Sequence, residues 1–146
     1  MIEERKNADL FAIEADAIVN TVNCKGVMGK GIALEFKKRY PKSYEVYRAA
    51  CDKGQLHPGI VLYVPGQRGE RTILHFPTKD DWRKPSQLQW IRDGLQYLKE
   101  HYREWNLKRI AMSQLGCGLG GLDWRDVGPL VREILGQEDL DVIVVT

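Results

Sequence analysis

The sequence has little cysteine and histidine, and their positions exclude two common kinds of structural support. Among 146 residues there are three cysteines and three histidines. An odd number of cysteines with no Cys-x-x-Cys pair argues against a disulfide framework, and no histidine stands at a spacing typical of metal ligands. We therefore expect reduced thiols, no metal site, and a core that is held together by apolar packing.

The sequence also lacks a long apolar run and a large excess of charge of one sign. Hydrophobic residues make up 43% of the chain and charged residues 29%, and the formal net charge at pH 7 is +2. No segment is apolar for long enough to cross a membrane, and the polar start does not resemble a signal peptide. This charge is too small to predict a polyanionic partner by itself. We expect one cytoplasmic domain over residues 1–146, with no membrane partner.

The usual nucleotide-binding fingerprints are missing, although the chain carries two glycine-rich segments. Residues 26–31 do not end in the Gly-Lys-Ser/Thr of a P-loop, and residues 116–121 lack the glycine spacing of dinucleotide-binding folds. Each segment follows a predicted buried strand and precedes a predicted helix, a junction where backbone N–H groups can approach an anion. The pair predicts a diphosphate held between two loops. The alternative is that the glycines serve only tight turns.

Strands and helices are predicted to alternate along the chain. Apolar runs predict strands at residues 17–20, 60–64, 71–76, 109–112 and 141–146, with a hairpin turn at 65–69. Helical periodicity and end signals predict helices at residues 31–40, 42–53, 86–102 and 123–135. Ser86 and Asp123 are the expected N-caps of the last two helices. The apolar face of the third helix is predicted to comprise Leu88, Ile91, Leu95, Leu98 and Tyr102.

This order predicts an α/β fold in which a mixed sheet lies between helical layers. Ligands of such folds bind beyond the carboxyl ends of the central strands. Both glycine-rich segments begin at predicted strand ends, and so do residues 76–79. The three loops converge on one crevice if their strands run in the same direction.

Three stretches together resemble a macrodomain, the α/β/α module that binds ADP-ribose. They are AIVNTVN at residues 17–23, GKGIA at 29–33 and QLGCGLGGLDW at 114–124. The resemblance spans essentially the whole chain and implies a three-layer α/β/α fold with a central mixed sheet. It is strongest to the DarG type, antitoxins that remove ADP-ribose from thymidine in DNA, in the branch that includes the human terminal ADP-ribose protein glycohydrolase. Residues 28–33 and 76–83 carry this closer similarity.

The resemblance implies roles in ADP-ribose binding for residues near the three loops. Asp9 would accept a hydrogen bond from the adenine amino group beside the Leu10 amide, and Asn23 would bond the distal ribose as donor and acceptor at once. Alternatively, Asp9 only forms a turn, and Asn23 only holds the loop backbone, as we expect of Asn20. The full set implied to bind ADP-ribose is Asp9, Leu10, Thr21, Asn23, Met28, Gly29, Gly31, Ile32, Thr78, Leu115, Gly116, Cys117, Gly118, Leu119, Gly120 and Gly121.

Lys79 is the expected catalytic residue. A lysine near a diphosphate can stabilise charge or, if desolvation lowers its pKa, act as a base or nucleophile. The resemblance favours attack on the anomeric carbon of the ribose, or on its ring-opened carbonyl, with release of thymidine. From the residues alone, without the resemblance, a solvated loop lysine is the favoured interpretation of Lys79.

One position departs from the human enzyme of this branch. That enzyme pairs its lysine with an aspartate in the second loop, where this chain has Gly120. Asp123 follows three residues later, and a helix cap explains it more simply. Glycosidic cleavage at DNA is therefore expected ahead of the hydrolysis of an acyl ester on glutamate.

Trp82, Arg83 and Lys84 follow Lys79 and combine an aromatic face with two cations, which suits a single-stranded nucleic acid. The alternative is that Trp82 packs on the sheet and the two cations are solvated.

We expect a DNA ADP-ribosyl glycohydrolase that removes ADP-ribose from thymidine in single-stranded DNA and counters a DNA-ADP-ribosylating toxin. The implied partners are ADP-ribose, ADP-ribosylated single-stranded DNA and the cognate toxin, which a region absent from these residues would engage. Alternatives are a reader that binds ADP-ribose without turnover, and a hydrolase of ADP-ribosylated glutamate on proteins. Neither a metal nor another cofactor is expected.

Overall fold

The fold is that of a computed structural model, which describes residues 1–67 and 69–146. Within these residues, strands and helices alternate as predicted. The elements are β1 (Ile2–Arg5), the short 3-10 helix η1 (Leu10–Ala12), β2 (Ala17–Val22), α1 (Gly31–Arg39), α2 (Pro41–Asp52), β3 (Leu62–Val64), β4 (Ile73–Pro77), α3 (Leu88–His101), β5 (Arg109–Met112), α4 (Trp124–Leu135) and β6 (Asp141–Val145). None of the helices in the described residues has both the length and the apolar character that crossing a membrane requires.

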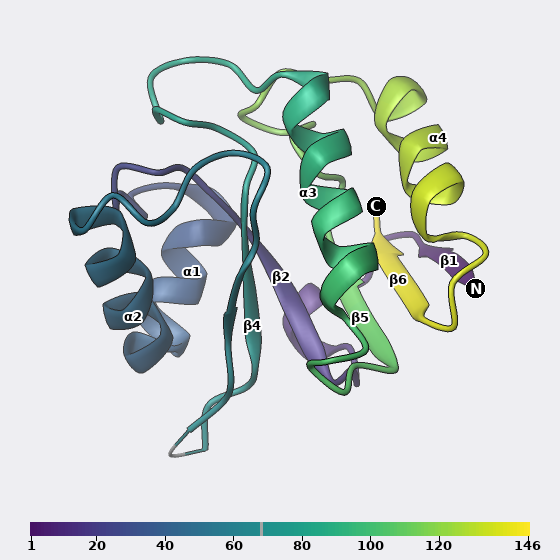
Figure 1. The fold of residues 1–146 in the computed structure, drawn as a ribbon, viewed down its shortest axis with the longest axis horizontal. Helices are drawn as coiled ribbons and strands as arrows, with labels where there is room; N and C mark the ends of the chain where they lie inside the picture. The colour runs from purple at the N-terminus through teal and green to yellow at the C-terminus, as the bar shows by residue number, and fades with distance from the viewer. Residues whose placement is uncertain (68) are drawn as a thin grey trace.

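The six strands form one mixed sheet in the order β1-β6-β5-β2-β4-β3. All neighbours are parallel except β3, which runs antiparallel to β4. The predicted mixed sheet and the predicted hairpin are therefore confirmed, although residue 68 of the hairpin turn lies outside the described residues. Because β2, β4 and β5 run in the same direction, their carboxyl ends meet at one edge of the sheet. In Figure 1 this is the upper edge, where β6 also ends at the C-terminus.

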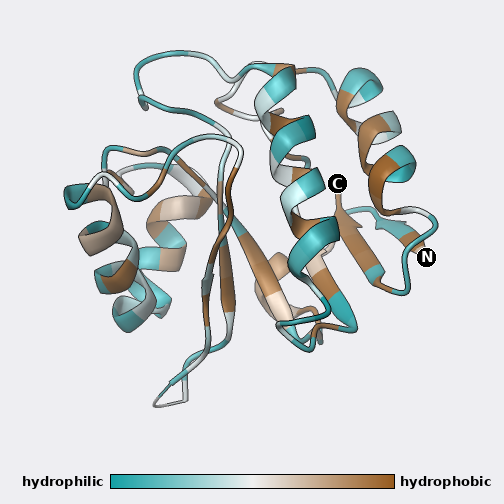
Figure 2. Cartoon of the chain, in the orientation of Figure 1, coloured by the Kyte–Doolittle hydropathy of each residue, from teal (hydrophilic) through white to brown (hydrophobic). Residues whose placement is uncertain are grey.

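Helices cover both faces of the sheet, which confirms the three-layer arrangement. The helices α1 and α2 lie on one side of the strands, and α3 and α4 lie on the other (Figure 1). Alternation along β2 explains the two cores: Val19 packs toward Ile91 of α3, whereas Ile18 belongs with Phe36 of α1. Strands that are buried on both faces read as continuous apolar runs, and Figure 2 shows them as hydrophobic along much of their length.

Several predicted element boundaries are confirmed by local chemistry. Helix α1 ends at Arg39, and Pro41 is the first residue of α2, where its missing N–H group does no harm. Asp123 is the N-cap of α4, and its carboxylate accepts a hydrogen bond from the Arg125 backbone N at 2.8 Å. Pro and Asp at such places act through contacts within one turn, so the sequence alone locates them.

Three expectations about the fold need correction. The prediction of Ser86 as an N-cap is wrong, because Gln87 occupies that position and Ser86 is buried against the second glycine-rich loop. Leu88 is also not on the buried face of α3: it is 39% exposed. Strand β1 was not predicted, because two of its four residues, Glu3 and Glu4, are exposed charges and it pairs only with β6 at the edge of the sheet.

Candidate functional site

A crevice of about 810 Å³ lies at the carboxyl edge of the sheet. The loops that follow β2, β4 and β5 all contribute to it, so the predicted convergence of three loops is confirmed. Its volume is in the range of small-molecule binding sites. The lining residues are Thr21, Val22, Asn23, Val27, Gly29, Lys30, Gly31, Ile32, Ala33, Thr78, Lys79, Trp82, Arg83, Ser113, Gln114, Gly116, Gly118, Leu119 and Gly120.

The N-terminus of α1 opens onto this crevice. Within the described residues, the N-cap Lys30 makes no side-chain hydrogen bond to the first turn, and the residues of that turn from Gly31 to Ala33 line the crevice. The first N–H groups of a helix have no partner inside the helix, and they carry partial positive charge. This part of the crevice therefore suits an anion such as a diphosphate.

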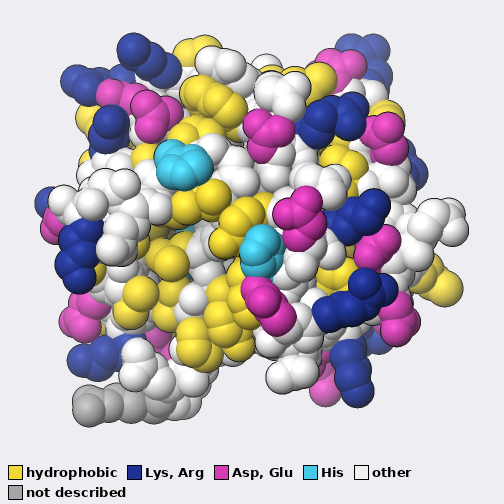
Figure 3. Space-filling view, in the orientation of Figure 1, with side chains coloured by type: hydrophobic (Ala, Val, Ile, Leu, Met, Phe, Trp, Pro, Cys, Tyr) yellow, Lys and Arg dark blue, Asp and Glu magenta, His cyan; other side chains and the backbone are white. Residues whose placement is uncertain are grey.

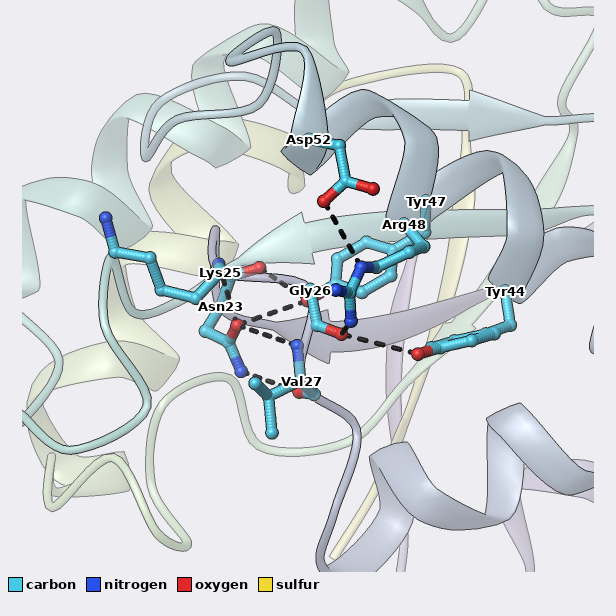
Figure 4. A network of polar contacts seen from close by, with 8 residues as sticks. All are labelled: Asn23, Lys25, Gly26, Val27, Tyr44, Tyr47, Arg48 and Asp52. Atoms are coloured by element: carbon cyan, nitrogen blue, oxygen red, sulfur yellow. Dashed lines mark hydrogen bonds and ion pairs between the residues drawn. The ribbon is translucent and has the colours of Figure 1, made fainter.

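The first glycine-rich loop is held from within by Asn23 (Figure 4). The Asn23 Oδ1 accepts hydrogen bonds from the backbone N of Lys25 at 2.9 Å and of Val27 at 3.4 Å, and its Nδ2 donates to the Val27 carbonyl at 2.7 Å. The loop-holding alternative is thus seen in the structure. Asn23 also lines the crevice, where the second N–H of its Nδ2 can donate to a ligand.

Helix α2 holds the same loop from behind, through contacts that were not predicted. The Tyr47 hydroxyl donates to the Asn23 carbonyl oxygen at 2.8 Å and contacts the Asn23 Oδ1 at 3.2 Å. The Gly26 carbonyl accepts from Arg48 Nη1 at 3.4 Å and from the Tyr44 hydroxyl at 3.5 Å. Burial raises the pKa of Tyr47, so its hydroxyl stays a donor. The spacing of residues 44, 47 and 48 predicts that they share one face of the helix, but it does not predict which segment packs against that face.

A buried polar chain lies beneath this loop. The Asn20 Nδ2 lies 3.7 Å from the Met28 Sδ and 3.3 Å from the His75 Nδ1, and the His75 Nε2 is 2.8 Å from the Ser43 Oγ. Desolvation lowers the pKa of His75 to about 3, so its ring is neutral. The expectation that Asn20 holds the loop backbone is corrected: Asn20 instead contacts the side chain of Met28, which is buried below the loop.

The second glycine-rich loop depends on glycine at three positions, one of which is Gly121 with φ +82°. Gly116 has φ +73°, which disfavours a side chain, and a Cβ at Gly120 would overlap the Gly116 carbonyl oxygen and the Ser86 hydroxyl. The Gly120 carbonyl accepts a hydrogen bond from the Ser86 backbone N at 3.0 Å, and Leu122 N donates to the Gly116 carbonyl at 2.9 Å. An acidic side chain therefore has no room at position 120 in this loop conformation.

The two loop cysteines pack as small apolar residues, as expected. Burial raises the pKa of Cys24 to about 12, and it also raises the pKa of Cys117. Cys24 belongs to the apolar cluster beneath the first loop, and Cys117 packs on the core under α3 and α4. Neither thiol is suited to act as a nucleophile, because the reactive form is the thiolate.

The third loop carries Lys79 into the crevice. Its backbone is anchored to the end of β2, because Thr78 N and Lys79 N both donate to the Val22 carbonyl, at 3.0 and 3.3 Å. The Cys24 backbone N donates to the Asp80 carbonyl at 3.0 Å, which ties this loop to the first one. The Lys79 side chain is half-buried, and its Nζ donates to the Trp82 carbonyl at 3.3 Å.

The turn after Lys79 is organised by Asp81. Its carboxylate accepts from the Arg83 backbone N at 2.9 Å, from Arg83 Nε at 3.0 Å and from Arg83 Nη2 at 2.7 Å. The Arg83 guanidinium holds the pKa of Asp81 well below its usual range. Trp82 is 48% exposed and lines the crevice, so the alternative that it packs on the sheet is wrong. Figure 3 shows basic and acidic side chains side by side at the upper left, over the loop between β4 and α3.

The structure brings most of the predicted site residues together, but not all of them. Asp9 and Leu10 lie outside the crevice lining: the Asp9 carboxylate caps η1 by accepting from Phe11 N at 3.0 Å, and Leu10 is buried. The other predicted residues outside the lining are Met28, Leu115, Cys117, Gly121 and Lys84. The lining residues that were not predicted are Val22, Val27, Lys30, Ala33, Ser113 and Gln114. Five of the six are direct neighbours of predicted positions, and Ser113 lies two residues before Leu115; that adjacency was the available signal. Over the described part of the chain, no three His, Cys, Asp or Glu side chains gather as metal ligands would.

An α/β/α sandwich with a glycine-lined crevice at the carboxyl edge of its sheet is the architecture that the residues predicted. The sequence model of the Macro domain matches residues 19–131. The chain therefore belongs to the macrodomain family.

Relatives within this family are similar over nearly the whole chain. A DNA ADP-ribosyl glycohydrolase from Mycobacterium tuberculosis is 45% identical over 141 residues, which are 94% of this chain and 40% of that protein. The chain thus spans less than half the length of that curated relative. The solved macrodomain of Mycobacterium tuberculosis DarG has a TM-score of 0.93 at 43% identity, with 99% of this chain and 97% of that chain covered. Thermosipho africanus DarTG in complex with ADP-ribose has a TM-score of 0.91 at 32% identity, covering 98% of this chain and 41% of that chain.

Proposed function

We propose that this chain is a DNA ADP-ribosyl glycohydrolase that removes ADP-ribose from thymidine in single-stranded DNA. One observation carries the proposal: a single crevice combines an open helix N-terminus, two glycine-rich loops and the half-buried Lys79. The similarity to proteins named DNA ADP-ribosyl glycohydrolase supports this substrate over other ADP-ribosylated groups.

ADP-ribose would lie along the crevice with its diphosphate at the start of α1. Backbone N–H groups from Gly29 to Ile32 and in the second loop would hold the phosphates and the distal ribose, and Asn23 would contact that ribose. Neutral N–H groups suit this task because they bind the anion without the need for a counter-charge from a metal. Asp9 would contact the adenine only if its carboxylate also reaches beyond the η1 cap that it forms here.

Lys79 would carry the chemistry through its side-chain nitrogen. Its nitrogen forms a bond to the anomeric carbon while the bond from that carbon to the thymidine nitrogen breaks. The bonding pair leaves with thymidine, which takes up the proton that the Lys79 nitrogen loses. Water then adds to the carbon, the bond to Lys79 breaks, and ADP-ribose is released. The net reaction consumes one water, and Lys79 must give up its hydrogen bond to the Trp82 carbonyl to reach the substrate.

Two features weigh against the other candidate functions. A reader needs the glycine-rich loops but has no use for a lysine held at the crevice wall, as Lys79 is. A glutamate deacylase with an acid in the second loop conflicts with Gly120, which has no space for a side chain.

Trp82 and Arg83 offer a place for a base and a phosphate of a DNA strand next to the crevice. Trp82 is exposed, and the Arg83 guanidinium lies 5.7 Å from the centre of its ring.

The biological role that follows is that of an antitoxin. A relative from Thermosipho africanus, named a DNA ADP-ribosyl transferase-DNA ADP-ribosyl glycohydrolase fusion protein, supports a DNA-ADP-ribosylating toxin as the partner. A substrate in chromosomal DNA is consistent with action in the cytoplasm, which we propose as its location.

The test is to offer the native protein two substrates in parallel, an oligonucleotide ADP-ribosylated on thymidine and a protein ADP-ribosylated on glutamate, and to measure binding of free ADP-ribose by calorimetry. Release of ADP-ribose from the oligonucleotide at a rate well above that from the protein supports the proposal. Binding of ADP-ribose without release from either substrate would make the chain a reader, and preferential release from glutamate would make it a deacylase.

A further inference from the structure

The hydrogen bonds around Asn23 leave only part of its amide available to a ligand (Figure 4). The Oδ1 already accepts from two backbone donors, Lys25 N and Val27 N, and the Tyr47 hydroxyl, whose one proton goes to the Asn23 main-chain oxygen, lies 3.2 Å from it. An amide oxygen has two lone pairs, so this acceptor is saturated within the protein. The Nδ2 has two N–H groups, of which one is used by the Val27 carbonyl. What remains for the crevice is one N–H.

The two backbone donors around the oxygen also fix which way the amide faces. If the amide flipped, its NH2 group would lie against two backbone N–H groups, and its oxygen would lie against the Val27 carbonyl. The Tyr47 hydroxyl is the side-chain group that holds Asn23 itself in place. It is fully buried with its ring, and it also holds the main-chain oxygen of Asn23 at 2.8 Å. Tyr47 thus holds the backbone of Asn23 by a hydrogen bond, and its hydroxyl also contacts the Asn23 side chain.

We propose that Tyr47 is a positioning residue for the crevice: through Asn23 it presents a single N–H donor, and no acceptor, to the distal part of the ligand. This inference rests on the proposed binding of ADP-ribose. It specifies that the ligand atom next to Asn23 must be a hydrogen-bond acceptor, such as a ribose oxygen. It also differs from the sequence expectation that the Asn23 amide serves the ribose as donor and acceptor at once.

The test compares ADP-ribose with ADP, which lacks the distal ribose. Loss of one neutral hydrogen bond should weaken ADP-ribose binding to Tyr47→Phe about fivefold, while ADP binding changes less than about twofold. Tyr44→Phe is the matched control on the same helix. Its hydroxyl reaches the Gly26 carbonyl at 3.5 Å and makes no hydrogen bond to Asn23 among the described residues, so both affinities should change little. A general loss of loop structure would weaken both ligands equally, and that result would overturn the inference.

A double-mutant cycle separates positioning from direct contact. If Tyr47 acts through Asn23, then Asn23→Ala should weaken ADP-ribose at least as much as Tyr47→Phe, and combining the two should add nothing further. Additive losses would refute the inference. The cycle also guards against a poorly folded Tyr47→Phe, because Asn23→Ala by itself must lose the preference for ADP-ribose over ADP. Should the native protein bind no ADP-ribose, the proposed function fails; native binding with an unaffected Tyr47→Phe refutes this inference alone.

Discussion

Mild acid should destabilise this protein through His75. The ring is buried, with Asn20 near its Nδ1 and Ser43 near its Nε2, and desolvation lowers its pKa from 6.5 to about 3. When the pH lies between these two values, His75 therefore binds a proton in the unfolded chain but not in the folded chain. Since the folded form is favoured only while His75 is neutral, stability is lost as the pH falls below about 6.5.

The size of the loss follows from the two pKa values. The unfolded state gains about 1.4 kcal/mol at about pH 5.5 and about 2 kcal/mol at about pH 5.0 relative to neutral pH. Urea unfolding of the native protein and of His75→Gln, at about pH 7.5 and about pH 5.5, measures it. The variant keeps every other titrating group, so the native protein should lose about 1.4 kcal/mol more than the variant between these two conditions. Equal losses in the two proteins would refute the account of a buried neutral imidazole.

Three further substitutions test packing and loop geometry. A Cβ on Gly94 of α3 would overlap the Phe76 ring, so Gly94→Ala should cost about 1–3 kcal/mol in urea unfolding, and an unchanged midpoint would contradict the close contact of α3 with the sheet. Asp123→Ala removes the N-cap of α4 and should lower the unfolding midpoint, whereas Asp123→Asn should keep most of it; equal loss in both would point to charge rather than to the cap. Gly120→Ala should weaken ADP-ribose binding in calorimetry while Gly118→Ala, which has open space around its Cβ position, should not; identical affinities would show that the second loop adapts.

Much of the fold could be predicted because its signals are local. Strands β2, β5 and β6 are apolar on both faces, and such runs stand out in the sequence, as do Pro41 and Asp123 at helix starts. Ser86 was misassigned because a serine before an apolar run is an ordinary capping signal, whereas here its backbone N donates to the Gly120 carbonyl. That bond depends on a loop more than thirty residues away, and no pattern near Ser86 records it.

In the candidate site, too, the features with local signals could be predicted and those that depend on distant contacts could not. The two glycine-rich loops could be located because each lies between an apolar strand and a helix, and Lys79 because it follows a third apolar strand. The hold of α2 on the first loop was missed, because a tyrosine such as Tyr47 on an amphipathic helix predicts burial but not a partner. The pairing of Asp81 with Arg83 was missed for a similar reason: its spacing fits any charged turn, and only the structure shows three hydrogen bonds from one residue to the other.

The most direct test of the account is a single-turnover assay on an oligonucleotide ADP-ribosylated at thymidine, with native protein and Lys79→Ala in excess over substrate. ADP-ribose affinity is measured on both proteins by calorimetry. We predict complete release by the native protein, and for Lys79→Ala a loss of release of about a hundredfold or more, with ADP-ribose affinity within a few-fold of native. Unimpaired release by Lys79→Ala would contradict the central claim that Lys79 performs the chemistry in this crevice.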